Sequence, residues 1–335
     1  HRCADLDLDV FELGRLCGSP LSQPCFDYSR CLPPPEGSGP TFYIYDYDCT
    51  LKPSSELEML KESNQNRKPS PIWRDAANEM GVLAETYESA CMFIHVNNRV
   101  DREPCAVDTP LWNYGANHFM IDLTDSGRDT RPSIANSLAM EGASNIRTCY
   151  YRSEYDMSLP LSPSKVFLQF ADIPATERKY FVTVKGSVYL GGHGSEERMS
   201  LVPLHDEDEG FIMSLHCFEV HGEHLLPENL DYCTRLKTRY ETHDYNDLMN
   251  TTFGLVPAGR SPGTYRLGEV MSAGAIPVFV ARDIVRPFRE QIDWPSFSFI
   301  FTPDQARISM AHILKAVSPE KLLDMQVFPC SFYGE

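Results

Sequence analysis

Short apolar runs alternate with helical patterns along most of this chain, and this alternation limits the fold more strongly than any other feature. Strands are predicted at 41–48, 90–97, 117–123, 179–186, 210–220, 251–256, 275–281 and 297–301, with an extended edge segment at 155–163. Helices are predicted at 69–83, 133–143, 264–273 and 303–317. Because strands that alternate with helices usually form a parallel sheet, we expect an α/β fold.

The chain has 335 residues, which is too long for one ordinary core, so two lobes are expected. The first residues are rich in turns and cysteines, and we predict a disulfide-stapled cap at 1–40. A polar stretch then separates a first lobe at 41–175 from a second lobe at 176–318. Residues 319–335 are predicted to be a tail, a fragment of a longer C-terminal region.

The formal net charge of −17 excludes a broad basic face of the kind that binds nucleic acid. An anionic ligand must therefore meet a local cluster of arginines and lysines. No run approaches the roughly 20 apolar residues that cross a bilayer, so any membrane anchor is expected outside this chain.

The eleven cysteines include no CxxC pair and the histidines no HExxH spacing, so a metal site is not predicted. Disulfides in an oxidising compartment are favoured instead, with Cys25–Cys31 and Cys217–Cys233 as candidate pairs. Asn250 begins the acceptor triplet Asn-Thr-Thr for N-glycosylation. Together these features indicate the lumen of the secretory pathway.

A loop from Gly259 to Gly263 joins the strand at 251–256 to the helix at 264–273. The backbone N–H groups of such a loop, with Arg260 and Arg266, would suit the oxygens of a diphosphate. Glu269 could then accept hydrogen bonds from a ribose. The alternative is a plain structural turn with a surface Arg–Glu pair at i, i+3.

The helix after this loop carries an apolar stripe of Leu267, Val270 and Met271, which would pack on the sheet, and Gly274 is placed to end it.

A second Gly-rich segment at 184–198 contains Lys185, His193 and Arg198, and it follows the first strand of the same lobe. Open α/β sheets bind ligands at such strand ends, although a surface loop with chance basic residues is an equal alternative. Two such loops in one lobe favour nucleotide binding.

Asp46-Tyr47-Asp48, which closes the strand at 41–48, is the rival signal. A strand that ends in Asp-x-Asp can hold a divalent ion and a diphosphate, since carboxylate oxygens suit Mn²⁺ and Mg²⁺. A three-residue pattern also arises by chance.

The segments around the first loop resemble the C-terminal signature of the exostosin glycosyltransferases. The residues that carry this resemblance are "LVPAGRSPGTYRLGEVMSAGAIPVFV" and "RPFREQIDW", supported by "CFDYSRC", "LWNYGANHFMIDL", "YDMSLPL", "KGSVYLGGHGSEER" and "YETHDYNDLMNTTF". The resemblance extends over roughly residues 20 to 300.

The resemblance implies a GT-B architecture, with two Rossmann-like doubly wound lobes that face each other across a cleft. It implies an inverting, metal-independent transferase without a cofactor, which moves a sugar from a UDP-sugar to a glycan or polysaccharide acceptor, and glucuronic acid is the favoured sugar. It also implies a Golgi or endoplasmic reticulum lumen location, or secretion, and a possible homo- or hetero-oligomer with another exostosin-like chain. The alternative is a noncatalytic exostosin-like subunit or a structural component of a complex or of an extracellular assembly.

Carried over by position, Arg198, Arg260 and Arg266 match family arginines expected near the diphosphate, and Glu269 matches a glutamate expected at the nucleotide. Lys185 and Gly259 belong to the same two loops. The chain departs from the animal pattern at Ala258, Ser261 and Pro262, where that branch has a more basic loop.

Inversion also requires a base that deprotonates the acceptor hydroxyl. Asp122, Asp156 and His118 are the candidates, by their positions in the first lobe.

Overall fold

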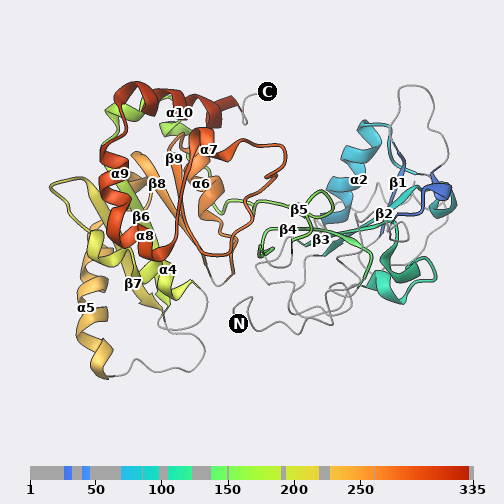
Figure 1. Ribbon diagram of the computed structural model, residues 1–335, viewed down its shortest axis with the longest axis horizontal. Helices are drawn as coiled ribbons and strands as arrows, with labels where there is room; N and C mark the ends of the chain where they lie inside the picture. Colours follow the sequence, from blue (N-terminus) through green and yellow to red (C-terminus); the bar gives the residue numbers. More distant parts are fainter. Residues whose placement is uncertain are drawn as a thin grey trace. The chain divides into compact units, whose positions relative to one another are not determined.

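The computed structural model describes residues 26–31, 40–45, 69–84, 86–97, 105–122, 137–148, 151–189, 194–218, 227–259 and 261–331. The chain forms two compact units, each with its own sheet (Figure 1). Unit 1 comprises His1–Ser144 and Cys149–Leu159, and unit 2 comprises Asn145–Thr148 and Pro160–Glu335.

The boundary between the units lies at residue 159 or 160, and the predicted boundary at 175 or 176 is wrong. The residues in between belong to the second core, since Phe167 is buried in it and its backbone N–H donates to Ser272 Oγ at 3.0 Å. The predicted tail is also part of unit 2. It forms helix α10, Pro319–Ser331, which buries Leu322 and Met325 in that core.

Unit 1 is built on a parallel sheet whose described strands follow chain order, β1-β2-β3-β4-β5. The strands are β1 Phe42–Ile44, β2 Met92–Asn97, β3 His118–Asp122, β4 Met140–Ala143 and β5 Met157–Ser158. Helix α2, Pro69–Glu79, packs beside β1 and agrees with the predicted helix at 69–83. Alternate residues of β1 face opposite sides: Tyr43 enters a core with Phe93, and Ile44 one with Ala77 of α2.

The helix predicted at 133–143 is wrong, because its described part ends in strand β4. Met, Glu and Ala favour helices in isolation, but pairing with β3 overrides that preference. Gly142 fits the strand closely: a Cβ atom there would lie 2.7 Å from the ring of Phe119 on β3.

The predicted pairing of Cys25 with Cys31 is also wrong, since Cys31 forms a disulfide with Cys91, 60 residues away. The segment around Cys31 is held to unit 1 by hydrogen bonds as well, because Asn117 accepts from the N–H of Asp27 at 2.6 Å and donates to its carbonyl at 3.0 Å. The remainder of the predicted cap, residues 1–25 and 32–39, and Asp46-Tyr47-Asp48 lie outside the described residues.

Unit 2 contains a parallel sheet in the order β10-β9-β8-β6-β7. Its strands are β6 Tyr180–Tyr189, β7 Phe211–Phe218, β8 Thr251–Pro257, β9 Ile276–Val280 and β10 Phe299–Phe301. The chain builds outward from β6 in one direction to β7 and then in the other through β8, β9 and β10, which is a doubly wound order. An α/β chain with a parallel sheet in each unit is thereby confirmed, and unit 2 has the predicted doubly wound order. The described strands of unit 1 follow chain order instead, and the arrangement of the units across a cleft stays a prediction.

The helices of unit 2 are α4 Ser195–Met199, α5 Pro227–Thr242, α6 Arg266–Ser272, α7 Trp294–Phe297, α8 Pro303–Gln305, α9 Ala311–Lys315 and α10. A π-helical segment, Ala306–Met310, joins α8 to α9, so the predicted helix at 303–317 is present with a local irregularity. The predicted disulfide Cys217–Cys233 is confirmed and links β7 to α5. No helix in the described parts of the chain has the length and apolar character that spanning a membrane requires.

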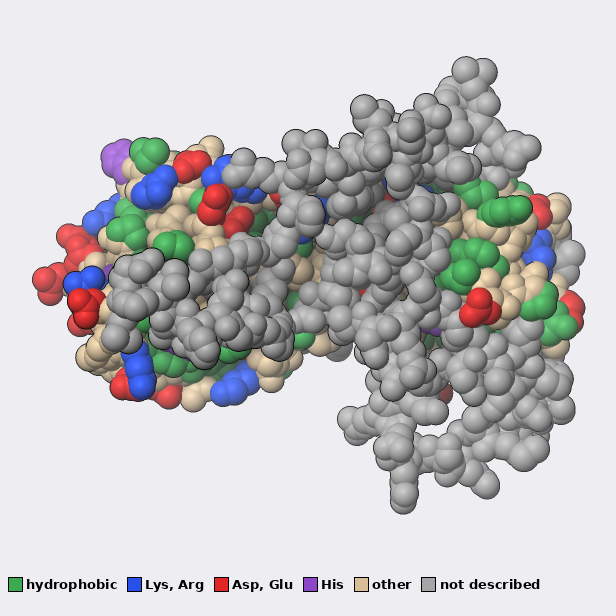
Figure 2. Space-filling model, turned by 90° about the horizontal axis from the view of Figure 1, so that it is seen from below, with side chains coloured by type: hydrophobic (Ala, Val, Ile, Leu, Met, Phe, Trp, Pro, Cys, Tyr) green, Lys and Arg blue, Asp and Glu red, His purple; other side chains and the backbone are tan. Residues whose placement is uncertain are grey.

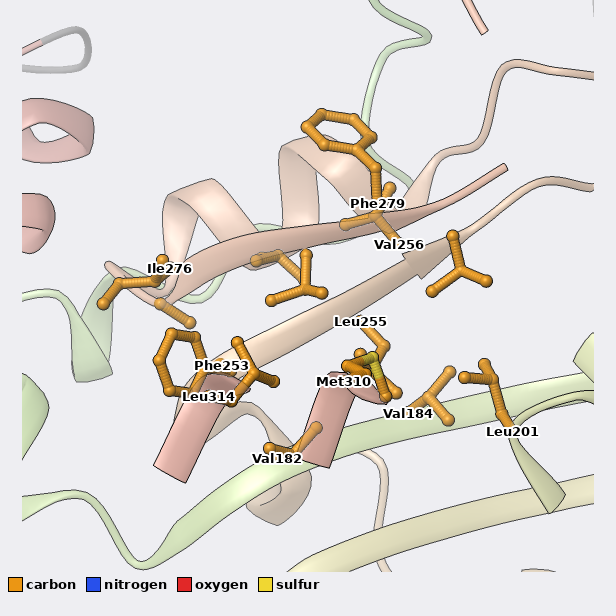
Figure 3. Close-up of a cluster of buried hydrophobic side chains, with 14 of the residues drawn as sticks. Val182, Val184, Leu201, Phe253, Leu255, Val256, Ile276, Phe279, Met310 and Leu314 are labelled. Carbon is orange, nitrogen blue, oxygen red and sulfur yellow. The ribbon is translucent and has the colours of Figure 1, made fainter. Parts of the chain in front are cut away.

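The core of unit 2 lies on both faces of its sheet (Figure 3). Val182 and Val184 of β6 and Leu255 of β8 pack with Met310 and Leu314 of the C-terminal helical segment. All seven residues of β8 are buried, as expected for a central parallel strand. This rigid centre fixes the strand ends that carry the candidate site.

Candidate functional site

A cavity of about 160 Å³ opens in unit 2 where strands β6 and β8 separate. The two strands pair only as far as Thr183 and Gly254, and beyond this point the cavity is lined by Val184 and Lys185 of β6 and by Pro257 of β8. This is the point at which the strand order reverses, where doubly wound sheets bind ligands. The described lining residues are Ser164, Val184, Lys185, Arg198, Tyr245, Pro257, Thr264, Tyr265, Arg266 and Glu269.

The two Gly-rich segments singled out in the sequence meet beside this cavity. Gly194 has a φ of +73°, and a Cβ atom there would lie 2.2 Å from the carbonyl oxygen of Gly259. No larger residue fits between the backbones. Arg198 joins the same segments, because its Nε donates to Ala258 O at 3.0 Å and its Nη1 to Ser187 O at 2.9 Å.

Lys185 reaches the cavity from β6. Its ammonium group donates to the carbonyl oxygen of His243 at 2.6 Å and to that of Tyr240, and it lies 3.6 Å from the centre of the Tyr240 ring. Burial lowers the pKa of Lys185. Since an ammonium group has three N–H donors, these contacts with described residues leave one donor for a ligand.

Arg266 is almost fully buried at the start of α6. Its Nε donates to Leu255 O at 3.2 Å and its Nη2 to Thr183 O at 3.4 Å, so the guanidinium group binds the ends of both separating strands. Two of its five N–H donors are used in this way, and a third points to the sulfur of Met249.

Glu269 is 2% exposed, and its carboxylate accepts hydrogen bonds from the hydroxyls of Ser164 and Tyr245. Burial is the main cause that raises the pKa of Tyr245, so this hydroxyl remains a donor. The alternative of a surface Arg–Glu pair is wrong, because Arg266 and Glu269 are both buried.

In the loop between Ala258 and Gly263, the amides of Gly259 and Gly263 donate within the protein. The N–H of Gly259 donates to Ser261 O at 3.0 Å, and the N–H of Gly263 donates to Asn145 Oδ1 at 3.1 Å. Helix α6 is only seven residues long. The site therefore offers anions its cationic side chains more than backbone amides, and Arg260 lies outside the described residues.

The positive charge of the cavity is local. Lys185, Arg198 and Arg266 line it with one carboxylate, that of Glu269. Elsewhere on the face of unit 2 seen in Figure 2, the coloured acidic and basic side chains are interspersed and form no broad basic area. An anionic ligand that enters the cavity would thus meet three cationic side chains and one carboxylate.

Of the three predicted base candidates in unit 1, His118 makes contacts that belong to the packing of the core. It is fully buried, its Nε2 lies 3.0 Å from Tyr45 Oη, and its Nδ1 lies 3.0 Å from Ala116 O. Its ring stacks on Phe93, and burial lowers the pKa of His118 to about 4.

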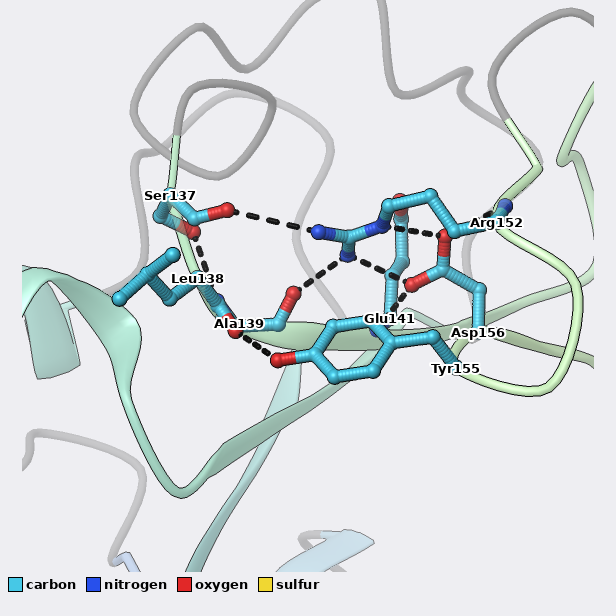
Figure 4. Close-up of polar contacts among 7 residues, drawn as sticks. All are labelled: Ser137, Leu138, Ala139, Glu141, Arg152, Tyr155 and Asp156. Atoms are coloured by element: carbon cyan, nitrogen blue, oxygen red, sulfur yellow. Dashed lines mark hydrogen bonds and ion pairs between the residues drawn. The ribbon is translucent and has the colours of Figure 1, made fainter. Parts of the chain in front are cut away.

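Asp156 is likewise engaged in structure (Figure 4). Its carboxylate accepts from Arg152 Nε at 2.8 Å and Nη2 at 2.6 Å and from the N–H of Glu141 at 3.0 Å. Tyr155 beside it donates to the carbonyl of Leu138. This network lies at the amino ends of β4 and β5, the edge opposite to the one where open α/β sheets bind ligands.

Asp122 lies at the carboxyl edge of the unit 1 sheet, opposite to the edge where the Asp156 network lies. It is the last residue of β3, in register with Asn97, the last residue of β2, and with Ala143, the last residue of β4. Among the three candidates, it alone occupies the carboxyl edge of the sheet.

Ser164 and Tyr245 were not predicted as site residues. Tyr245 lies in the segment "YETHDYNDLMNTTF", shortly before a buried strand. Its position before that strand is the sequence signal that could have identified it as a site residue. Ser164 gave no signal, because it lies 105 residues from the glutamate that it binds.

A family model for the Exostosin GT47 domain matches residues 77–317. Exostosin-1 of Mus musculus is 27% identical over 327 residues, which cover 90% of this chain and 41% of that protein. Exostosin-1b of Danio rerio is 26% identical over 348 residues, covering 96% of this chain and 43% of that protein. The chain thus spans about two fifths of the length of these relatives.

Among solved structures, the lipopolysaccharide outer core galactosyltransferase WaaB, apo form, aligns with 87% of this chain and 93% of its own at a TM-score of 0.39 and 11% identity, a likeness too distant to carry an argument. The family model, in contrast, covers most of the chain, including every described residue that lines the cavity. The protein belongs to the exostosin GT47 family of glycosyltransferases.

Proposed function

We propose that unit 2 binds the diphosphate of a UDP-sugar in the cavity between β6 and β8, and that the protein transfers the sugar to a glycan acceptor held by unit 1. The observation that carries this proposal is the gathering of Lys185, Arg198 and Arg266 at the switch point of a doubly wound sheet. These residues come from three separate segments of an acidic chain, so their meeting concentrates positive charge where a nucleotide would lie.

The cationic side chains would stabilise the charge that develops on the departing diphosphate. The hydroxyls of Ser164 and Tyr245 fix the carboxylate of Glu269, which would accept hydrogen bonds from the ribose. The three cations would then neutralise charge that a divalent ion neutralises in metal-dependent transferases, and we propose a reaction that needs neither metal nor cofactor.

For the acceptor half, we propose direct displacement with inversion at the anomeric carbon. Asp122 is the preferred base because of its place at the carboxyl edge of its sheet. Glucuronic acid is the proposed sugar, on the basis of the family resemblance. A carboxylate on the sugar would add a second anionic group to the ligand of a locally positive site.

We propose that the protein works in the Golgi or endoplasmic reticulum lumen. Cys31–Cys91 and Cys217–Cys233 are typical of an oxidising compartment. Asn250, directly before β8, is proposed to carry a glycan; its side-chain oxygen accepts from the N–H of Lys179 at 3.3 Å. Release of a mass increment by a glycosidase would test this site.

The transfer itself is tested with a set of UDP-sugars and with heparan-type and plant wall oligosaccharides as acceptors. The expected result is transfer from UDP-glucuronic acid that persists in a chelator, with an inverted anomeric configuration by nuclear magnetic resonance. Loss of transfer in the chelator would instead support the metal-dependent mechanism. UDP binding without transfer from any donor would favour the noncatalytic exostosin-like subunit.

A further inference from the structure

Between strands β4 and β5 of unit 1, the chain enters unit 2 for four residues, Asn145–Thr148, and then returns. Three of these four residues are buried, since Asn145 is 3% exposed, Ile146 1% and Arg147 7%, whereas Thr148 is exposed. Arg147 also forms an isolated antiparallel bridge with Ile284, just after β9. The segment is therefore packed into unit 2 rather than laid over its surface.

The side chain of Asn145 binds the loop that precedes α6. Its Oδ1 accepts from Ser261 Oγ at 2.7 Å and from the N–H of Gly263 at 3.1 Å. A backbone N–H can only donate, so the oxygen of the amide, not its nitrogen, must face the loop. Ser261 is itself only 7% exposed, so its bond to Asn145 is buried, and the bond from Gly263 is partly buried.

The loop that precedes α6 is fixed by hydrogen bonds at both of its ends. At its start, Ala258 donates to the carbonyl of Val280 at 3.1 Å and accepts from Arg198 Nε. At its end, Asn145 holds Ser261 and Gly263, three residues before Arg266 begins helix α6. A loop that is fixed at both ends sets the position of the helix that follows it.

We propose that Asn145 is a positioning residue of the nucleotide-sugar site, an inference that rests on the function proposed above. Its side-chain carbonyl fixes the loop at 261–263 and, through it, the start of the helix that carries Arg266 and Glu269. The serine at 261, where the chain departs from the animal exostosin pattern, thereby acquires a specific partner.

The effect of losing this contact follows from the two hydrogen bonds that Asn145 accepts. Removal of a buried acceptor leaves two donors unpaired, and the freed loop would have to be ordered again when UDP binds. We expect Asn145→Ala to weaken UDP binding about tenfold. Asn145→Asp keeps both acceptor positions and should restore affinity to within about threefold of the native protein.

Calorimetry of UDP binding to the whole chain tests this, with Asn117→Ala as the matched control. Asn117 is a buried asparagine, 1% exposed, that also joins two chain segments, but it belongs to unit 1. Its variant should lose stability and keep UDP affinity. Equal UDP affinities of the native protein and Asn145→Ala would overturn the proposal, as would an equal loss in the Asn117 variant.

Amide hydrogen exchange separates this inference from the function on which it rests. In Asn145→Ala without UDP, a peptide over 258–265 should exchange at least tenfold faster, whereas one over 211–218 in β7 should not change. If the native protein fails to bind UDP, the proposed function is lost while the exchange result still decides whether Asn145 fixes the loop. Should Asn145→Ala not fold, Ser261→Ala removes one of the two hydrogen bonds. Unchanged exchange of the 258–265 peptide in that variant would refute the claim that Asn145 fixes the loop.

Discussion

Replacement of Tyr245 by Phe removes one hydroxyl from the candidate site and leaves the ring in place. That hydroxyl donates to the buried carboxylate of Glu269, and Ser164 supplies the other donor. The ring keeps its neighbours, with Phe167 at 5.9 Å and the Nζ atom of Lys165 at 5.5 Å from its centre. The substitution therefore tests one hydrogen bond.

The magnitude follows from the charge and the burial of the acceptor. A hydrogen bond to a charged group contributes about 2 kcal/mol, and the 2% exposure of Glu269 leaves little water to replace the lost donor. Unit 2 should then melt about 6 °C lower. Since a carboxylate held by one donor rotates more freely, UDP affinity should fall about tenfold.

Thermal unfolding by calorimetry measures the first effect and UDP titration the second, with Tyr180→Phe as the control. Tyr180 also donates to a carboxylate, that of Asp247 at 2.6 Å, but this carboxylate is 41% exposed and ion-paired with Lys179. We expect the control to lose no more than about 0.5 kcal/mol and to bind UDP as the native protein does. A Tyr245→Phe protein with native melting temperature and native affinity would refute the reasoning.

Three further predictions concern packing and titration. Gly268→Ala should not raise the melting temperature despite the better helix propensity of Ala, about 1 kcal/mol, because the added Cβ would lie 3.0 Å from Pro163; a rise of several degrees would contradict this. Asp156→Asn should destabilise unit 1 by about 3 kcal/mol in urea unfolding, since Arg152, whose side chain is 11% exposed, would lose the charge of the carboxylate that it pairs with, and UDP affinity should not change. The pKa of His118 in the folded protein is lowered to about 4, so the unfolded chain binds the proton at a higher pH than the folded one does. The contribution of His118 to the free energy of unfolding should therefore be complete above pH 6.5, and stability should fall by up to about 3 kcal/mol as the pH drops towards 4. Urea unfolding at both pH values checks this, and an equally steep fall in His118→Gln would assign it to other groups.

The sequence predicted most strands of the unit 2 sheet, because strands and helices leave a local periodic pattern of apolar residues. The strands of unit 2 and the helix after the Gly-rich loop fall where the apolar pattern places them, and Gly274 ends that helix with a φ of +66°. Residues at strand ends and loop starts could therefore be assigned to one edge of the sheet. Lys185, Arg198 and Glu269 do line one cavity there.

Contacts between distant segments left no such signal. Cys31 pairs with a partner 60 residues away, and Ser164 reaches Glu269 across 105 residues, so neither contact follows from spacing. Strand β4 was mistaken for a helix because its residues favour helices, and its pairing with β3 decided otherwise. Gly268 has a lower helix propensity than Ala, but it makes room for Pro163, which lies 105 residues earlier in the chain.

The central claim, that the cavity of unit 2 binds the diphosphate of a UDP-sugar, is tested most directly by calorimetry of UDP binding to the native chain, Arg198→Ala and Arg307→Ala. Arg307 is an exposed arginine of the same unit, paired with Asp304 at 2.7 Å, and serves as the matched control. We predict saturable binding by the native chain, a loss of at least about tenfold in Arg198→Ala and no change in Arg307→Ala. No heat of binding in the folded native protein, or equal affinities in all three, would contradict the claim.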